Sequence, residues 1–230
     1  MSIVYKCEQG TMEWYRLRLG IPTASMFHKI VTPTGKISEQ RFEYMNRLIA
    51  ERLLQESMDT PLSVEWVEHG KEQEPNAVAQ LKFVHQWELE PVGFVTSNDG
   101  KLGCSPDRLV KHKVEAVEIK CPAPFTQIGY LRDGVGDKYR PQVQGQILVG
   151  DFERVHFYAY HPRMPAFGLT THPDEAYLKL LARGLSQFCD ELDAETERCR
   201  RMGVYMPNPG YTTPHEEAAP GPDPLQSIVP

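Results

Sequence analysis

The sequence VEAVEIK at residues 114–120 decides the fold, because its side chains alternate as they do along a β-strand. One face of this strand carries Val114, Ala116, Glu118 and Lys120. The other face carries Glu115, Val117 and Ile119. Glu118 and Lys120 are therefore neighbours on a largely apolar strand, where burial of a carboxylate and an ammonium is costly unless they pair or bind a cation. A divalent metal ion would supply that partner.

Ser105-Pro106-Asp107 stands eleven residues before Glu118 and adds a second carboxylate. Carboxylate oxygens suit Mg²⁺ or Mn²⁺, so Asp107 and Glu118 are expected to act as catalytic metal ligands. Lys120 is expected to join them, because a lysine beside a metal can orient or deprotonate a water and offset charge in the transition state. This set is typical of phosphodiester hydrolysis. The alternative from the residues alone is an edge strand with a solvated Glu–Lys pair.

Five motifs follow one another along the chain. They are WYRLRLGIPTAS (residues 14–25), GKEQE (70–74), CSPD (104–107), EIKCP (118–122) and YRPQVQ (139–144). Their order resembles that of the lambda-type exonuclease (YqaJ-like viral recombinase) family, over roughly residues 8 to 165. The resemblance implies an α/β fold with a restriction-endonuclease-like core, in which helices flank a central mixed β-sheet.

The resemblance also implies an activity. It predicts a Mg²⁺-dependent exonuclease, with Mn²⁺ as a substitute ion, that digests one strand of linear double-stranded DNA from the 5′ end. The remaining 3′ single strand would enter recombination with a single-strand annealing protein. A homotrimeric ring around the duplex is a further implication, and it would give processivity by topology.

Two more metal ligands are implied by the resemblance, the carboxylate of Glu74 and the backbone carbonyl of Ile119. Glu74 is expected on a helix that packs on the sheet, because apolar residues follow it at three- and four-residue steps. These residues are Ala77, Val78, Leu81 and Val84. From the residues alone, Glu74 would be an ordinary exposed glutamate.

A site for the terminal 5′-phosphate is implied as well. Arg18, Ser25 and Ser105 resemble the residues that hold this phosphate, with Thr23 in support, since a guanidinium and hydroxyls suit phosphate oxygens. From the residues alone, Arg18 would serve solubility, and Thr23 and Ser25 would cap a helix over residues 26–30. The two roles are compatible, because a helix N-terminus attracts phosphate.

Gln142 and Tyr139 are placed in the active site by the same resemblance, with Gln142 also close to the DNA. Pro141 fits the first turn of a helix, which puts Gln142 and Gln146 on one face. An amide and a phenol can hydrogen-bond to water or phosphate without adding charge. The alternative is a polar helix surface.

The chain has 230 residues, 40% of them apolar, and can bury one large core. We expect a single nuclease domain at residues 1–203 and a Pro-rich C-terminal tail at residues 204–230, which cannot bury enough apolar surface to order itself. No apolar run approaches the roughly 20 residues that span a bilayer, and the N-terminus lacks the apolar region of a signal peptide. We therefore expect a cytoplasmic protein with no membrane partner. Five cysteines without a C-x-x-C pair favour reduced thiols.

The net charge of -6 opposes DNA binding, which depends on neutralising phosphates. Basic residues nevertheless gather at three places. These are Arg16 with Arg18, Arg108 with Lys111 and Lys113, and Lys138 with Arg140. Clustered charge around a cleft can steer DNA while the outer surface stays acidic, and a metal ion adds positive charge at the scissile phosphate.

Hydrophobic periodicity gives a coarse map of the secondary structure. Helices are expected at residues 38–55 with Ser38 as the cap, at 69–87, from Pro141 onward, and along a C-terminal apolar stripe from Leu178 to Leu192. The first helix should bury Phe42, Met45, Ile49 and Leu53. Strands are expected at residues 93–96, 102–104, 108–110, 114–120, 155–160 and 168–171, with a hairpin turn at 98–100.

Three functions are compatible with these observations. The first is the 5′-to-3′ exonuclease. The second is a restriction-type or structure-specific endonuclease, which would use the same carboxylates without the phosphate site. The third is a nonenzymatic DNA-binding or assembly subunit, against which the intact Asp107, Glu118 and Lys120 count.

Overall fold

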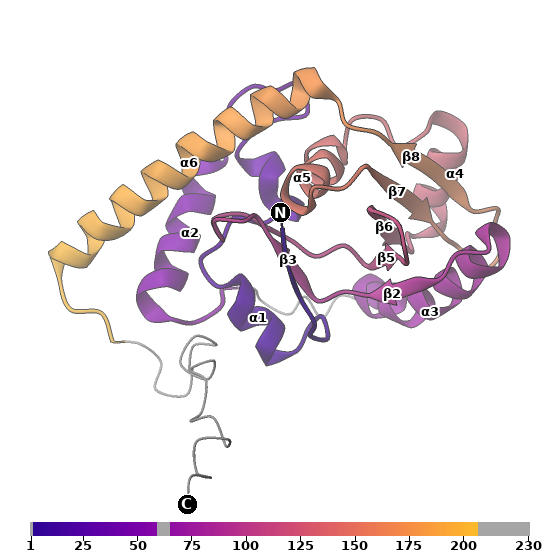
Figure 1. Ribbon diagram of the computed structural model, residues 1–230, viewed down its shortest axis with the longest axis horizontal. Helices are drawn as coiled ribbons and strands as arrows, with labels where there is room; N and C mark the ends of the chain where they lie inside the picture. The colour runs from indigo at the N-terminus through magenta and orange to yellow at the C-terminus, as the bar shows by residue number, and fades with distance from the viewer. Residues whose placement is uncertain (1, 59–64, 207–230) are drawn as a thin grey trace, which may run out of the picture.

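A five-stranded mixed sheet forms the centre of the molecule (Figure 1). The computed structural model describes residues 2–58 and 65–206, with residues 65–71 described by their backbone alone. The strands lie in the order β2 (Leu89–Pro91), β5 (Arg108–Val110), β6 (Glu115–Lys120), β7 (Arg154–Ala159) and β8 (Phe167–Thr171). β6 pairs antiparallel with β5 and parallel with β7. The predicted mixed sheet is confirmed, with most of VEAVEIK in its central strand.

A second, antiparallel sheet contains β1 (Ile3–Tyr5), β3 (Phe94–Thr96) and β4 (Gly103–Cys104), in that order. The predicted turn between the last two strands is confirmed. Gly100 closes it with a positive φ of 70° and donates its N–H to the carbonyl of Ser97 over 2.9 Å. Glycine suits this position because it carries no Cβ penalty at positive φ. β4 leads directly into the Ser105-Pro106-Asp107 motif.

The helices cover both faces of the larger sheet. They are α1 (Met12–Arg18), the 3₁₀ helix η1 (Ala24–Lys29), α2 (Arg41–Leu54), α3 (Glu65–His85), α4 (Pro124–Asp133), α5 (Arg140–Gly150) and α6 (Glu175–Met202). Val117 and Ile119 of β6 pack in a core with Ala77 and Leu81 of α3. Ala116 belongs instead to the larger core that α2, α5 and α6 share. The alternation predicted for β6 is therefore confirmed, and both of its faces are buried.

α5 and η1 lie unusually close together because Gly145 of α5 has no side chain. A Cβ at this position would overlap the ring of Phe27, which is fully buried on η1. Cores of native density leave no room for an added methyl group at such a contact. The close approach brings the segment that carries Ser25 against the helix that carries Gln142 and Gln146.

α2 begins later than predicted. Ser38 does not cap the helix, because its hydroxyl accepts the N–H of Gln40 over 3.3 Å in a turn before the helix, and Gln40 is the N-cap residue. Met45, Ile49 and Leu53 are buried as expected, whereas Phe42 is 63% exposed. The buried face of α2 also contains Tyr44 and Leu48, so it is rotated away from Phe42, which lies at its margin.

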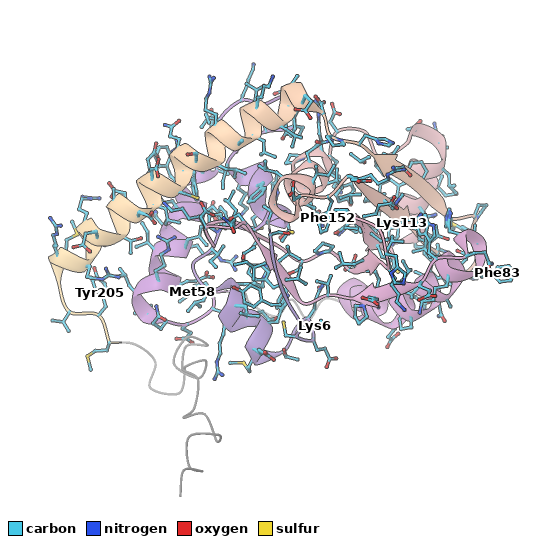
Figure 2. The ribbon with its side chains drawn as sticks, in the orientation of Figure 1. Lys6, Met58, Phe83, Lys113, Phe152 and Tyr205 are labelled. Atoms are coloured by element: carbon cyan, nitrogen blue, oxygen red, sulfur yellow. The ribbon has the colours of Figure 1, made fainter. Side chains whose placement is uncertain are left out.

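The stripe on α3 also ends earlier than predicted. Ala77 and Leu81 are buried, but Val84 is 60% exposed. The last turn of this helix instead carries Val84 and Phe83 into solvent, and Figure 2 shows Phe83 projecting outward from the fold. On α6 the stripe is buried at Leu181, Leu185, Phe188 and Leu192, with Leu178 packed against the same core.

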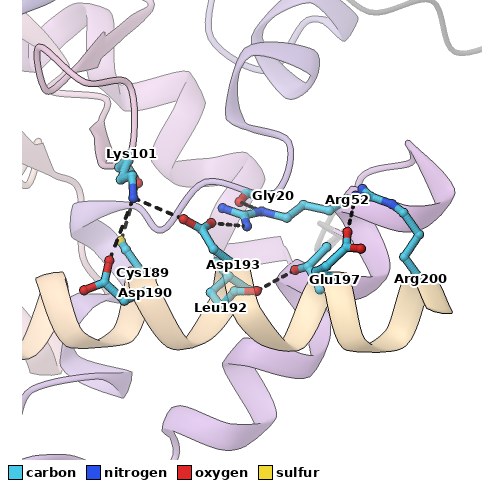
Figure 3. A network of polar contacts seen from close by, with 10 residues as sticks. Gly20, Arg52, Lys101, Cys189, Asp190, Leu192, Asp193, Glu197 and Arg200 are labelled. Atoms are coloured by element: carbon cyan, nitrogen blue, oxygen red, sulfur yellow. Dashed lines mark hydrogen bonds and ion pairs between the residues drawn. The ribbon is translucent and has the colours of Figure 1, made fainter. Parts of the chain in front are cut away.

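An ion network joins α6 to the segment that precedes η1 (Figure 3). Asp193 of α6 pairs with Arg52 of α2 over 2.8 Å and with Lys101 of the β3–β4 turn over 3.1 Å. Arg52 in turn donates its Nε–H to the carbonyl of Gly20 over 2.8 Å. The network therefore fixes the chain just after Arg18.

The predicted tail falls almost wholly on residues 207–230, outside the described residues. Within the described part of the chain, no helix has the length and apolar character needed to cross a membrane. The five cysteines, all of them described, carry free thiols.

Candidate active site

The β5–β6 hairpin places Asp107 across from Glu118. Arg108 pairs with Val117 in the register of the two strands, so the residues one step further on face each other. The N–H of Asp107 donates to the carbonyl of Val117 over 3.0 Å. Its Oδ2 accepts the N–H of Ile119 over 2.5 Å. The two predicted metal carboxylates are therefore held together by the backbone of one hairpin.

Glu118 is buried, with only 3% of its surface exposed. Its Oε1 accepts hydrogen bonds from Lys120 Nζ over 2.5 Å and from Gln142 Nε2 over 2.6 Å. Its Oε2 accepts a hydrogen bond from Gln146 Nε2 over 2.5 Å. A buried carboxylate needs such donors, because an uncompensated charge away from water is costly. The structure thus brings Glu118, Lys120 and Gln142 together as the sequence predicted.

The charges in the hairpin shift two pKa values upward. Burial, followed by the negative charge of Glu118, raises the pKa of Asp107 well above its usual range. Burial disfavours the charged form of Lys120, but the carboxylates of Glu118 and Asp107 outweigh it and raise the pKa of this lysine. Lys120 therefore stays protonated beside the two carboxylates.

The residues of the hairpin fit a Mg²⁺ or Mn²⁺ ion. The pKa of Asp107 is raised by burial and then by the like charge of Glu118, and a divalent cation would offset both effects. Mg²⁺ is commonly bound through one or two carboxylates together with substrate phosphates, which matches this donor set. Ile119, whose carbonyl is a further predicted ligand, lies between Glu118 and Lys120 in the strand.

Glu74 lies nearby but is paired with a cation. Its Oε1 is 2.9 Å from Nη2 of Arg108, the residue after Asp107. The negative charge of Glu74 contributes to the raised pKa of Asp107, after burial and Glu118. Among residues 2–58 and 72–206, no three His, Cys, Asp or Glu side chains come together as a metal-binding group. A role for Glu74 as a third ligand would thus require it to leave Arg108.

Arg18 and Ser105 form the second part of the site. Arg18 Nη1 lies 3.4 Å from Ser105 Oγ. The guanidinium of Arg18 stacks on the indole of Trp14, 4.1 Å from the ring centroid. Trp14 also donates its Nε1–H to Ser105 Oγ over 3.0 Å and to the carbonyl of Gly93 over 3.1 Å. A guanidinium held in this way is oriented before any anion arrives.

Thr23 and Ser25 lie at the start of η1. Thr23 is buried, and its hydroxyl is 3.3 Å from that of Ser25, which is exposed. The N–H of Thr23 donates to the phenol of Tyr44 over 3.2 Å. Thr23 is the N-cap residue of η1, but its side chain makes no capping hydrogen bond. Thr23 thus contacts Ser25 through its hydroxyl, and the expected helix is a single short 3₁₀ segment.

A pocket of about 180 Å³ joins the two parts of the site. Its lining residues are Gln9, Trp14, Arg18, Ala24, Ser25, Ser105, Glu118, Lys120, Gln142 and Gln146. The predicted phosphate residues Arg18, Ser25 and Ser105 therefore open into the same space as Glu118 and Lys120. A larger cavity of about 880 Å³, which includes Glu74 and Arg108, shares Gln9 with this pocket.

Tyr139 lies behind the pocket. Its hydroxyl is 2.7 Å from that of Tyr130, and its ring is 5.8 Å from Lys120 Nζ. It lines a separate cavity of about 190 Å³. The structure therefore places the Tyr139 ring against Lys120, with the phenol directed to a neighbouring tyrosine.

The two cysteines near the carboxylates have raised thiol pKa values. Burial, followed by the charge of Glu118, raises the pKa of the Cys104 thiol. Burial, followed by Glu74 and Asp107, raises the pKa of Cys121 to about 12. Thiols with raised pKa values are poor nucleophiles, because the thiolate is the reactive form.

Gln9, Trp14 and Gln146 line the pocket but were not predicted as site residues. Gln9 donates from Nε2 to the carbonyls of Val92 and Pro106, over 2.9 and 2.8 Å, and so braces the strand that leads to Asp107. Trp14 belongs to the first motif, and Gln146 shares a helix face with Gln142. Its place in the motif was the available signal for Trp14, and the shared helix face was the signal for Gln146, whereas Gln9 lies outside all five motifs.

A model of the YqaJ-like viral recombinase domain matches residues 13–153, which is more than half of the chain. The chain belongs to the YqaJ-like viral recombinase family. This confirms the resemblance drawn from the five motifs. A search of curated proteins finds no match.

Solved structures are similar to this family member. The alkaline exonuclease LHK-Exo from Laribacter hongkongensis has 28% sequence identity and a TM-score of 0.74, over 84% of this chain and 97% of that chain. Its complex with dAMP has 30% identity and a TM-score of 0.73, with the same coverage. A phage-related exonuclease from Haemophilus somnus 129PT, at 13% identity, has a TM-score of 0.58 over 76% of this chain and 96% of that chain, and shares the fold.

Proposed function

We propose that this member of the YqaJ-like viral recombinase family is a Mg²⁺-dependent 5′-to-3′ exonuclease of linear double-stranded DNA, with Mn²⁺ as a substitute ion. The observation that carries the proposal is the 180 Å³ pocket that Arg18, Ser25 and Ser105 share with Glu118 and Lys120. An anion site beside two carboxylates suits an enzyme that holds a terminal phosphate and cuts next to it. The similarity to LHK-Exo, an alkaline exonuclease, supports the same activity.

Each side chain has a distinct role in this proposal. Arg18, Ser25 and Ser105 hold the terminal 5′-phosphate and so select the phosphodiester that lies against the hairpin. Asp107 and Glu118 would hold the metal ion, with the Ile119 carbonyl and Glu74 as further ligands. When bound, this ion polarises the phosphate and lowers the pKa of a water.

The neighbouring residues orient these groups and balance charge. Lys120 is protonated and offsets negative charge as it grows on the phosphate. Gln142 fixes the Glu118 carboxylate through a 2.6 Å hydrogen bond. Tyr139 packs its ring against Lys120 and limits where the ammonium can move.

Three DNA substrates test the proposal. A 5′-phosphorylated linear duplex, the same duplex with 5′-hydroxyl ends and a covalently closed circle are incubated with Mg²⁺, with Mn²⁺ and with EDTA. The phosphorylated duplex should be digested fastest, the circle should stay intact, and EDTA should stop the reaction. Cutting of the circle would establish the endonuclease. If the protein binds DNA but does not cleave it with either metal ion, the protein is a nonenzymatic DNA-binding or assembly subunit.

Variants connect this activity to the pocket. Asp107→Asn and Glu118→Gln should abolish cleavage, since each removes a charged ligand with little change in volume. Glu88→Gln is the control, because Glu88 pairs only with Lys111 in an exposed ion pair among the described residues. Arg18→Ala should remove the preference for the 5′-phosphate, and Arg18→Lys should restore part of it, because lysine keeps the charge without the planar fork.

The proposal also includes the assembly and the pathway. The family resemblance supports a homotrimeric ring and a single-strand annealing protein as partner, with 3′ single strands as the product passed on. A ring would help a chain with a net charge of -6 stay on DNA without tight binding. Light scattering that gives the molar mass of a single chain, both with and without DNA, would rule out the homotrimeric ring.

A further inference from the structure

Gln146 makes a contact with the reaction centre that the proposed function has not yet used. It lies one helical turn after Gln142 on α5, and only 1% of its surface is exposed. Its Nε2 donates to Glu118 Oε2 over 2.5 Å, on the carboxylate oxygen that Lys120 and Gln142 leave free. The two glutamines thus hold the two oxygens of one carboxylate.

The orientation of the Gln146 amide is set by chemistry. An ionised carboxylate accepts hydrogen bonds only, so the NH₂ group of Gln146 must face Glu118 and its carbonyl oxygen must point elsewhere. That oxygen, Oε1, is buried and has no hydrogen-bond partner in the described part of the chain. Buried polar atoms of native proteins are nearly always hydrogen-bonded, so a partner is expected from outside the fold.

The pocket supplies the place for that partner. Gln146 lines the 180 Å³ pocket together with Glu118 and with the predicted phosphate residues, which are Arg18, Ser25 and Ser105. Gln127 also has a buried Oε1 without a partner among the described residues, but it does not line this pocket. An acceptor beside two carboxylates suits an O–H donor such as a water of a hydrated cation.

We propose that Gln146 is a positioning residue for metal binding, which fixes the Glu118 carboxylate through Nε2 and accepts a hydrogen bond from a pocket water through Oε1. The proposal rests on the metal-dependent activity proposed above. Groups that orient a ligand in this way set metal affinity without touching the metal. Gln146 differs in this from Gln142, which shares the Oε1 side of Glu118 with Lys120.

A neighbouring glutamine provides the control. Gln144 is buried on the same helix, and both ends of its amide bind the backbone. Its Nε2 donates to the carbonyl of His172 over 2.8 Å, and its Oε1 accepts the N–H of Asp174 over 3.0 Å. Gln144→Met and Gln146→Met make the same chemical change in the same helix, so a general loss of packing would appear in both.

The test measures binding of Mn²⁺ alone, by electron paramagnetic resonance, together with thermal unfolding and kcat. Gln146→Met should weaken Mn²⁺ binding about tenfold and lower kcat, with KM for DNA nearly unchanged. Gln144→Met should lower the unfolding temperature and leave Mn²⁺ affinity as in the wild type. Should Gln146→Met fold poorly, Gln146→Asn keeps an amide that is one methylene too short, and it should also weaken Mn²⁺ binding.

Two results would overturn the proposal in different ways. If the wild type binds Mn²⁺ and both Gln146 variants bind it equally well, or if Gln144→Met weakens binding as much, Gln146 has a structural role only. If the wild type binds no Mn²⁺, the metal site itself is lost, and the proposed function falls together with this inference.

Discussion

The indole N–H of Trp14 donates a hydrogen bond to the hydroxyl of Ser105, with 3.0 Å between Nε1 and Oγ. The same indole stacks on Arg18. One side chain of α1 therefore holds Arg18 of the same helix and Ser105, which follows β4, in a common arrangement; both residues belong to the anion cluster (Arg18, Ser25 and Ser105) that is proposed to bind the 5′-phosphate. Preorganised side chains bind a charged ligand more tightly, because less conformational entropy is lost on binding.

Trp14 variants should separate the two contacts. Trp14→Phe keeps a ring for Arg18 but loses the indole N–H. The lost hydrogen bond should cost about 1 kcal/mol and reduce the preference for the 5′-phosphate roughly fivefold. Trp14→Leu loses the stack as well and should reduce the preference further. The measurement is the ratio of kcat/KM on 5′-phosphate and 5′-hydroxyl duplexes. Trp87→Phe is the control, because Trp87 follows the end of α3 and does not line this pocket. A full preference in Trp14→Leu would show that the indole does not organise the cluster.

The ion pair of Glu74 and Arg108 makes a prediction about the metal requirement. Glu74→Gln should raise the Mg²⁺ concentration needed for half-maximal rate by about tenfold, because a charged ligand is lost. Arg108→Gln should shift it in the opposite direction, since Glu74 is released from its 2.9 Å pair. Initial rates across a Mg²⁺ titration measure both. Superimposable curves for Glu74→Gln and the wild type would leave Glu74 as a surface ion-pair partner.

Gly145→Ala should destabilise the protein although alanine favours helices. The added methyl group overlaps the buried Phe27 ring, and overpacking of this kind costs about 1–3 kcal/mol, more than the gain of about 1 kcal/mol in helix propensity. The displaced η1 should also carry Ser25 away from the pocket and weaken the 5′-phosphate preference. Urea unfolding gives the stability.

Gly129→Ala is the matched control for that helix effect. A Cβ at Gly129 of α4 meets nothing within 4 Å, so the variant should gain about 0.5–1 kcal/mol. Equal stabilisation by both alanines would show that α5 and η1 can move apart without cost.

The Asp193 network predicts a pH-dependent stability. Burial raises the pKa of Asp193, but the hydrogen bonds from Arg52 and Lys101 outweigh it and hold that pKa below its usual value. A lowered pKa in the folded state means that the carboxylate stabilises the fold above its unfolded pKa of about 3.9. This contribution is lost as the pH falls through the folded pKa.

Asp193→Asn should therefore cost about 0.5–1 kcal/mol of unfolding free energy near neutral pH, a modest value because half of the side chain is exposed. The difference from the wild type should shrink toward zero in acid, below both pKa values. Asp190→Asn is the control, since its carboxylate is 74% exposed and 3.9 Å from Lys101. A pH-independent difference for Asp193→Asn would assign the effect to packing.

Local geometry explains which parts of the site were predictable. Glu118 and Lys120 share a face because strand periodicity is fixed by the backbone, and Asp107 meets Glu118 because a hairpin sets its own register. Trp14 reaches Ser105 across 91 positions and Gln146 reaches Glu118 across 28, so no local period reports these contacts. Their partners are decided by how α1 and α5 dock.

The same distinction holds for the fold. A period of two residues predicts the central strand, and apolar steps of three or four residues predict the stripe on α6. The turn at residues 98–100 follows from its turn-forming residues. The helix cap predicted at Ser38 was wrong because its hydroxyl binds the N–H of Gln40 in a turn before the helix. Phe42 was wrong as a core residue because α2 faces α6 along a rotated stripe. The first error comes from a local turn that competes with the helix, and the second from a tertiary contact that overrides a local pattern.

The close approach of α5 to η1 has a consequence for biosynthesis. A nascent chain that has emerged only through β6 already contains Asp107, Glu118 and the anion cluster, but it lacks Gln142 and Gln146, which hold Glu118 in place. Contacts between distant segments form late, because the chain entropy between them must be lost first. On the proposed function, the site is therefore completed only when α5 docks, and a partly made chain would lack an ordered Glu118.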